Sequence, residues 1–208
     1  TITAQKRAQD TLDVGLNVAV ISGADLAARR VTQVSDLSAF TPNVDIKENM
    51  PGILPVVTIR GVGLNDFSAT NNPSAGVYVD EVYLSSLALM NFDLFDLERM
   101  EALKGPQGTL YGRNSTAGAI NILTARPTFG GVEGRVAGGY GDYKTGELEG
   151  MVNVPLSDTF ALRLSGKGVR QDEGFFFNRK TNTDFGRRKV GLGRLQARWA
   201  PSEDLDVL

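Results

Sequence analysis

The stretch MEALKGPQGTLYGRNSTAGAINILTARP, residues 100–127, contains four glycines and two prolines among residues that alternate like those of β-strands. Such a stretch can form a glycine-rich loop that binds a phosphate, or a compact strand–turn–strand unit in which glycine supplies the dihedral angles of the turn. No lysine followed by serine or threonine comes after the last glycine of a GxxxxG spacing. Because a phosphate loop needs that lysine and hydroxyl, the sequence favours the strand–turn–strand unit.

The composition excludes several classes of function. The chain has 208 residues and a net charge of −2, whereas surfaces that bind nucleic acid usually carry a clear basic excess. It contains no cysteine and no histidine. Disulfides, thiolate nucleophiles, HExxH zinc sites and histidine-based triads are therefore excluded. Carboxylates, lysine, tyrosine and serine remain as catalytic options by composition. Our expectation is nevertheless that there are no catalytic residues, no cofactor and no nucleic-acid partner.

The two ends of the chain predict that it is part of a longer protein. No apolar run approaches the ~20 residues of a membrane helix. No basic-then-apolar leader opens the chain, so we expect that a signal peptide was removed or was never present. The last residues, DLDVL, begin what we interpret as a new strand, and we expect further strands beyond Leu208.

The first part of the chain, up to about residue 127, mixes short helices and strands. Residues 18–30 predict a strand followed by a short helix, with Ser22 as the N-cap and an acidic residue three positions later. Residues 32–44 predict a second short helix that stops before Pro42. Residues 56–61 and 76–84 are rich in β-branched and aromatic residues, which predicts two strands.

After residue 130 the pattern changes to long alternating segments. Apolar and polar residues alternate in residues 146–156, 160–172 and 194–201, although Val190 and Leu192 fall in phase with the arginines of the last segment. Strands of soluble proteins usually have ~5–6 residues, and strands that cross a membrane need ~9–11. The lengths therefore favour a membrane, and an ordinary soluble sheet with one wet face remains the alternative.

The connections between these segments also alternate in length. Residues 155–159 and 200–204 are short turns, and residues 173–188 form a long polar loop with aromatic residues. Short turns on one side and long loops on the other are typical of outer-membrane barrels, in which aromatic residues such as Phe160 and Trp199 lie at the interface. The side chains that we expect to face lipid are Leu148, Val152, Val154, Phe160, Leu162, Leu164, Leu195 and Trp199.

Four stretches, taken together, resemble the TonB-dependent outer-membrane receptors. They are TITAQKR (1–7), TIRG (58–61), VYVDEVYL (77–84) and DLERMEALKGPQGTLYGRNSTAGAINILT (96–124), in the order that the family has. The resemblance implies an α+β plug domain, a small mixed sheet with short helices, inside a transmembrane antiparallel barrel of 22 strands. Residues 1–7 would be the remainder of a TonB box, residues 8–127 the plug, and residues 130–208 the first four or five barrel strands.

The resemblance also assigns roles at the two ends of the plug. In the family the N-terminal segment pairs as an added strand with the TonB protein, which would here use Thr1, Ile2, Thr3 and Ala4. Two plug cations in the family latch onto barrel glutamates, and these correspond to Arg60 and Lys104. The family usually has arginine in place of Lys104, and lysine cannot make the planar two-pronged contact. The family also usually has Asp-Gly where this chain has Asp80-Glu81.

The family binds solutes with plug loops that point outward, which by position are residues 47–54, 62–76 and 83–92. No dense basic cluster marks these loops, so the plug alone does not favour a strongly anionic ferric chelate. Asp66 with its neighbouring asparagines matches no defined Ca²⁺ spacing, and we predict no metal site. The predicted solute contacts are Asn49, Met50, Asn65, Asp66, Phe67, Asn71, Asn72, Tyr83, Ser85 and Met90.

Three functions follow from these observations as hypotheses. The first is TonB-dependent active transport of a scarce solute, such as a ferric siderophore, a cobalamin-like molecule, a glycan or an aromatic compound, across the bacterial outer membrane. Its partners would be TonB, outer-membrane lipid and the small solute. The second is a passive porin or adhesin, which would not need the first 127 residues. The third is a soluble enzyme that uses carboxylates such as Asp80, Glu81, Glu98 and Glu101.

Overall fold

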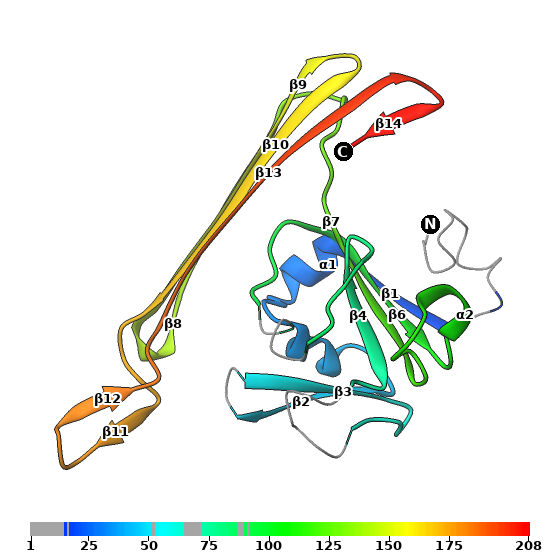
Figure 1. Ribbon diagram of the computed structural model, residues 1–208. Helices are drawn as coiled ribbons and strands as arrows, with labels where there is room; N and C mark the ends of the chain where they lie inside the picture. Colours follow the sequence, from blue (N-terminus) through cyan, green and yellow to red (C-terminus); the bar gives the residue numbers. More distant parts are fainter. Residues whose placement is uncertain (1–14, 16, 51–52, 65–71, 87–89, 91) are drawn as a thin grey trace. The chain divides into compact units, whose positions relative to one another are not determined.

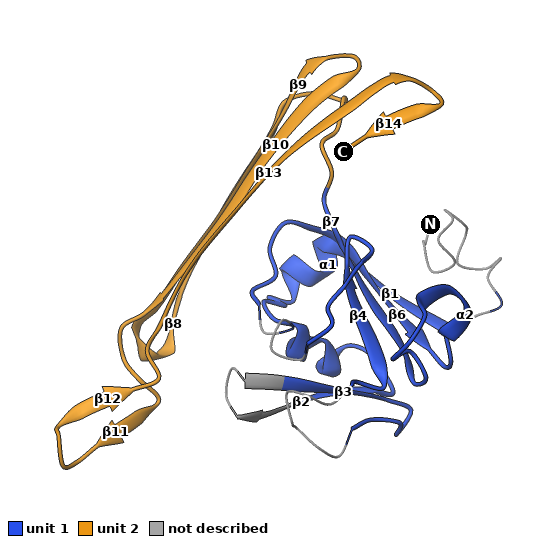
Figure 2. Cartoon of the chain, in the orientation of Figure 1, with its two compact units in different colours: residues 1–125 blue, residues 126–208 orange. Residues whose placement is uncertain are grey.

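The computed structural model describes residues 15, 17–50, 53–64, 72–86, 90 and 92–208. The chain divides into two compact units, residues 1–125 and residues 126–208 (Figures 1 and 2). The first unit mixes short helices with short strands, and the second consists almost entirely of long strands. Among the described residues, every helix is too short or too polar to cross a bilayer.

The first unit is built around a mixed five-stranded sheet in the order β1-β6-β7-β4-β5. Strands β4 and β7 are parallel, the other neighbouring pairs are antiparallel, and β2 and β3 form a separate hairpin. The elements of this unit are β1 (Asn17–Ser22), α1 (Gly23–Ala28), η2 (Val34–Ala39), β2 (Val44–Met50), β3 (Ile53–Ile59), β4 (Ala75–Val79), β5 (Val82–Tyr83), β6 (Leu97–Lys104), α2 (Gly108–Tyr111) and β7 (Gly118–Thr124).

The two predicted helices are present, and side-chain caps begin both of them. The backbone N–H of Asp25 donates to Ser22 Oγ over 3.1 Å, which places the N-cap of α1 where the sequence predicted it. The predicted helix within residues 32–44 is the 3-10 helix η2. At its start the carboxylate of Asp36 accepts backbone hydrogen bonds from Thr32 and Gln33 at 2.8 and 2.9 Å.

The predicted single strand over residues 76–84 is wrong, because the chain reverses inside it. Asp80 and Glu81 both have positive φ, 47° and 70°, and they join β4 to β5 in a two-residue turn. Hairpin turns of this type need positive φ at both central residues, and Asp-Gly is the usual signal. With glutamate in the second position that signal is missing. The Asp80 carboxylate secures the turn by accepting from Thr124 N and Oγ1 at 2.9 and 2.8 Å.

Residues 100–127 form the strand–turn–strand unit that the sequence favours, with one difference. Strands β6 and β7 are antiparallel neighbours, but the predicted tight turn at residues 107–112 is the helical turn α2. At Gly118 φ is 149°, and an added Cβ would overlap the carbonyl oxygen of Leu103 on the neighbouring strand. This glycine therefore permits the close approach of β6 and β7.

The core of the first unit lies on one face of the sheet. Alternate residues of β4, β6 and β7, among them Val77, Met100 and Ile120, pack with Leu26 of α1 and Val34 of η2. The intervening residues point to the other face, because successive side chains of a strand alternate. There they form a second, smaller cluster of Tyr78, Leu103, Tyr111 and Ala119.

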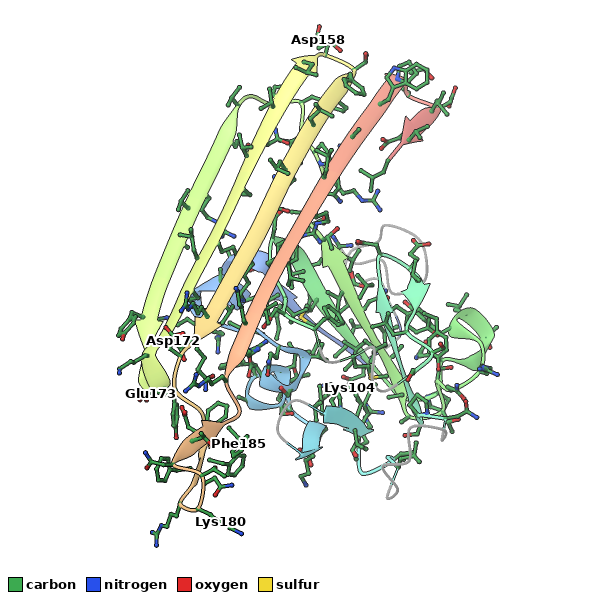
Figure 3. All side chains as sticks on the ribbon, turned by 60° about the vertical axis from the view of Figure 1, so that its left-hand side comes forward. Lys104, Asp158, Asp172, Glu173, Lys180 and Phe185 are labelled. Atoms are coloured by element: carbon green, nitrogen blue, oxygen red, sulfur yellow. The ribbon has the colours of Figure 1, made fainter. Side chains whose placement is uncertain are left out.

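The second unit is a five-stranded antiparallel sheet whose strands follow one another in the order β8-β9-β10-β13-β14. Figure 3 labels Asp158 in the short turn between β9 and β10, and Lys180 and Phe185 in the β11–β12 hairpin beyond the opposite end of the sheet. The elements are β8 (Glu133–Gly141), η4 (Asp142–Lys144), β9 (Thr145–Ser157), β10 (Phe160–Gln171), β11 (Phe176–Asn178), β12 (Thr183–Phe185), β13 (Arg188–Ser202) and β14 (Leu205–Val207).

Two details of the second unit differ from the sequence interpretation. The loop of residues 173–188 contains the hairpin of β11 and β12, in which Phe176 pairs with Phe185. Strand β8 precedes the first alternating segment, and its many small residues gave it no apolar–polar pattern. The short turns after β9 and β13 lie where the sequence predicted them.

The apolar face of this sheet is exposed, and its polar face is the more buried one. On β10 the polar side chains Arg163 and Lys167 are buried, whereas Leu164 is 53% exposed. The exposed apolar side chains form one continuous surface, because Leu164 pairs in register with Val152 on β9 and with Leu195 on β13. Soluble antiparallel sheets bury their apolar face instead. An exposed apolar face is what a strand that crosses a bilayer presents to lipid.

Candidate functional site

The structure describes only some of the residues predicted to contact a solute. Asn72 and Ser85 are exposed, and Tyr83 is half-buried at the end of the β4–β5 hairpin. Asn49 and Met50 lie at the end of β2. The remaining predicted solute contacts Asn65, Asp66, Phe67 and Asn71, and the predicted TonB contacts Thr1, Ile2, Thr3 and Ala4, lie outside the described residues.

One residue that the sequence analysis did not select joins two of the predicted contacts. The side-chain amide of Asn114 donates to Tyr83 Oη over 2.8 Å and to Asn72 Oδ1 over 3.3 Å. Asn114 has φ of 63°, a conformation that asparagine tolerates better than most residues. The only sequence signal for it is its place in the turn-rich segment GRNSTAG (112–118). Asn72, the β4–β5 hairpin and the segment after α2 are therefore linked through one amide.

Behind this amide lies a cluster of three tyrosines. The ring centroids of Tyr78 and Tyr83 are 5.3 Å apart, and those of Tyr78 and Tyr111 are 5.0 Å apart in an edge-to-face arrangement. The hydroxyl of Tyr78 donates to the backbone oxygen of Tyr111 over 2.5 Å, and Asn121 Nδ2 donates to Tyr111 Oη over 3.1 Å. Edge-to-face aromatic pairs and satisfied buried polar groups give a rigid support.

The hydroxyl of Tyr111 is in an environment that disfavours ionisation. Burial, and then the negative charge of Glu101, raise the pKa of Tyr111 to about 12. Glu101 is fully buried on the same face of the sheet, and its carboxylate pairs with Arg99 at 2.8 Å. Tyr111 therefore remains a neutral hydrogen-bonding group at physiological pH.

The prediction that Met90 contacts a solute does not agree with its position. Its side chain is 1% exposed and belongs to the main hydrophobic cluster, beside residues of the sheet and of η2. Methionine fills irregular gaps in a core because its side chain is unbranched and flexible. Met90 is therefore a packing residue of the hydrophobic core, and this corrects the sequence interpretation.

The two predicted latch residues lie close to each other in the first unit. Arg60 follows β3 with φ of 54°, and its side chain is exposed. Its Nη1 lies 3.6 Å from the position that a Cβ of Gly105 would occupy, and Gly105 directly follows Lys104 at the end of β6 (Figure 3). The fold thus brings two positively charged residues from distant parts of the sequence close together in space. Their role as a latch stays a prediction.

The carboxylates considered for an enzyme hold structural positions. Asp80 secures the turn to Thr124, and Glu98 and Glu101 both pair with Arg99. Glu81 is exposed in the β4–β5 turn. Among the described residues, there is no group of three or more acidic side chains placed to bind a metal ion.

The β11–β12 hairpin carries a surface of aromatic and basic side chains, with Phe176, Phe177 and Phe185 exposed. At its base the ring of Phe175 packs edge-to-face on Tyr143 at 4.7 Å between centroids. Asp184 accepts from Gly174 N at 2.7 Å and from Arg187 at 2.6 Å, and these bonds, the one from Arg187 first, lower the pKa of Asp184 to about 2. The hairpin is therefore an ordered part of the long connection.

Comparison with known proteins agrees with this architecture. Residues 10–119 match the TonB-dependent Receptor Plug Domain family. The chain is 29% identical over 206 residues to the pesticin receptor of Yersinia pestis, covering 97% of this chain and 30% of that protein. It is 32% identical over 147 residues to the catecholate siderophore receptor Fiu of Escherichia coli, covering 66% and 18%.

The crystal structure of the ferric yersiniabactin uptake receptor FyuA from Yersinia pestis superposes with a TM-score of 0.78 at 29% identity, covering 90% of this chain and 29% of that one. The ferripyoverdine receptor of Pseudomonas aeruginosa, at 17% identity and a TM-score of 0.77, shares the fold. The chain thus spans less than a third of the length of these curated relatives. With a family match over more than half of its residues, the chain belongs to the TonB-dependent outer-membrane receptors, as their plug domain followed by the first strands of the barrel.

Proposed function

We propose that the whole protein is an energy-coupled transporter that takes up a ferric siderophore across the bacterial outer membrane. One observation carries the proposal: a plug domain is joined, in one chain, to a sheet that exposes its apolar face. A plug has a purpose only where it closes a pore, and the exposed apolar face suits a pore wall in lipid. A passive porin would not need the plug.

The solute class is proposed from the relatives. Those compared above are receptors for pesticin, ferric yersiniabactin, a catecholate siderophore and ferripyoverdine. In this chain Asn72 and Tyr83, joined through Asn114, offer hydrogen-bonding groups and an aromatic face on the plug. We propose that these groups form part of the floor on which the solute rests, and that the tyrosine cluster keeps this floor in place.

Energy would enter at the opposite end of the plug. We propose that TonB binds the N-terminal segment as an added strand, and that a pull on it displaces the plug. The chain itself would carry out no covalent chemistry, since the carboxylates of the plug serve its turns and ion pairs. It would thus be a transporter and not an enzyme.

The test is uptake by cells that carry the full-length protein. Radiolabelled iron is supplied as ferric yersiniabactin or as a ferric catecholate, and binding and accumulation are measured with and without an uncoupler of the proton-motive force. Deleting residues 1–7 should abolish accumulation and leave binding nearly intact. Replacing Asn65, Asp66 and Phe67 together by alanine should weaken binding. Accumulation that continues after the deletion, or in the presence of the uncoupler, would identify a passive pore and refute the proposal.

A further inference from the structure

The segment that connects β7 to β8 is held by side chains of the second unit. The segment comprises residues 125–132, of which residues 126–132 belong to that unit (Figure 2). Two side chains from different strands bind its backbone: Asn153 of β9 and Arg198 of β13. We call residues 127–131 the linker and these two side chains the anchor.

Asn153 uses both ends of its amide on the linker. Its Oδ1 accepts from Thr128 N over 2.9 Å, and its Nδ2 donates to the backbone oxygens of Thr128 and Gly131 over 3.0 and 3.1 Å. The side chain is completely buried. Removing it would break three hydrogen bonds to the linker backbone at once. Aspartate could not replace it, because an ionised carboxylate has no hydrogen to donate.

Arg198 holds the linker at a second point. Its Nη1 donates to the backbone oxygen of Pro127 over 3.2 Å, and its guanidinium lies 4.9 Å from the ring centroid of Phe129, within the range of a cation–π contact. Asp206 fixes the guanidinium by accepting from Nε and Nη2 at 2.9 and 2.8 Å. A two-pronged contact of this kind sets both the position and the plane of the group.

The two anchor points lie on the same face of the sheet, near its short-turn end. Asn153 pairs in register with Arg163 on β10, and Arg198 pairs with Ala161 on the same strand. Residues 161 and 163 are two positions apart, so their side chains share a face. Leu162, between them, belongs to the opposite, apolar face. The linker therefore binds the polar face across β10, and Ala161 is fully buried there.

We propose that Asn153 and Arg198 are positioning residues for transport: they hold the linker on the barrel wall, so that the C-terminal end of the plug stays fixed while the N-terminal segment is pulled. The inference rests on the proposed energy-coupled function. Pulling the N-terminus would then move the N-terminal part of the plug while its C-terminal end stayed in place. The plug would rearrange inside the barrel and would not leave it as a whole domain. The anchor consists of two side chains of the barrel strands β9 and β13. The predicted latch uses other residues, Arg60 and Lys104 of the plug.

The test applies force to the full-length protein in a bilayer, by pulling its N-terminus in a single-molecule experiment without TonB. In the wild type, extension should stop with the linker still bound. Either anchor residue still holds the linker when the other is lost, so the test uses the double variant Asn153→Ala/Arg198→Lys. In it the released length should increase by about 17 Å, which is five linker residues at ~3.4 Å each. The matched control is Asn178→Ala, because Asn178 caps a turn of the β11–β12 hairpin and does not contact the linker.

The outcomes separate the anchor from the transport function. A longer release in the double variant, no change in Asn178→Ala, and slower uptake with unchanged solute binding would support the proposal. A wild-type release that already includes the linker would overturn it, as would a double variant that extends no further. If the double variant fails to assemble, Arg198→Lys alone decides, because it should lower the force at which the linker detaches, and an unchanged force would overturn the proposal. Failure of the proposed function would instead appear as wild-type accumulation that ignores the uncoupler, whatever the pulling experiment gives.

Discussion

The two units use the same amino acids in opposite ways. In the plug, the side chains of Val77, Ile120 and Ile122 are buried and face a common core. In the strand sheet, Leu195 is 70% and Trp199 48% exposed, while Arg163 and Lys167 are buried. Both sheets alternate with a period of two residues. The two-residue period therefore identifies strands in both units. Which face of the sheet is buried then separates a sheet that packs against a protein core from one whose apolar face is suited to lipid.

A pair of glycine substitutions should give the largest difference between the units. Gly118→Ala places a methyl group against the carbonyl oxygen of Leu103, in a backbone conformation with φ of 149°. We expect it to lower the local stability of β6 and β7 by about 3–5 kcal/mol. Gly168→Ala on β10 has open space around the new methyl group, and it should change stability by no more than about 0.5 kcal/mol.

The measurement is native-state hydrogen exchange of the strand amides in the purified full-length receptor, which reports a local free energy of opening. Equal effects of the two alanines would show that β6 and β7 are not as closely packed as the structure describes. Thr124, whose backbone amide is bonded to Asp80, is a convenient reporter at the end of β7.

A charge on the exposed apolar face should give the next largest effect. Leu164→Arg, near the middle of β10, should cost ~2–4 kcal/mol when the barrel assembles in a bilayer. Ser165→Ala, at the adjacent buried position on the polar face, should be much milder. Assembly of the two full-length variants into lipid vesicles can be followed by the shift in mobility that folded barrels show on gels. If both variants assemble equally well, the assignment of the lipid face is wrong.

Tyr111→Phe tests the plug's second cluster. The loss of the hydroxyl leaves buried Asn121 without this acceptor and should destabilise the plug by about 1–3 kcal/mol. Tyr143→Phe, on an exposed ring in the other unit, should be nearly neutral. The comparison requires hydrogen exchange of β7 in both variants. A Tyr111→Phe plug as stable as the wild type would mean that the hydroxyl contributes nothing.

The same tyrosine predicts a dependence on pH. Its pKa is raised to about 12 in the fold, above the ordinary value of 10.0. The folded state therefore keeps its proton longer than the unfolded chain does, and the stability that this provides is complete below pH 10 and is lost between about pH 10 and 12. Tyr111→Phe should flatten the stability profile in that range. An unchanged profile would show that Tyr111 ionises normally in the fold.

The sequence predicted features that depend on neighbouring residues in the chain. Ser22 with an acidic residue three positions later predicted the start of α1, and the alternation in residues 160–172 predicted β10. Strand β8 and the β11–β12 hairpin were not recognised, because small residues and clustered phenylalanines give no alternation. For the candidate site, the resemblance to the family predicted which loops contact the solute. It did not predict the residues that hold those loops in place. Asn114 and Asn153 bind residues that are 22–42 positions away in the chain, and local sequence patterns carry no information at that distance.

The smallest predicted effect concerns the one turn that departs from the family's usual Asp-Gly. Glu81 has φ of 70°, a conformation that costs a residue with a Cβ roughly 1–2 kcal/mol. Glycine removes that cost, but it also increases the freedom of the unfolded chain, which cancels roughly 0.5–1 kcal/mol of the gain. Glu81→Gly should therefore stabilise the β4–β5 hairpin by no more than about 1.5 kcal/mol.

The control in the other unit is Tyr143→Gly, where φ is also positive, at 56°. There the substitution removes the ring that packs on Phe175, so the relief of backbone strain is offset and no gain is expected. Hydrogen exchange of Leu84, whose amide donates to Val77 across the β4–β5 hairpin, reports the first variant. A loss of protection there in Glu81→Gly would mean that the glutamate side chain itself stabilises the turn. The departure from Asp-Gly would then be a gain in stability rather than a cost.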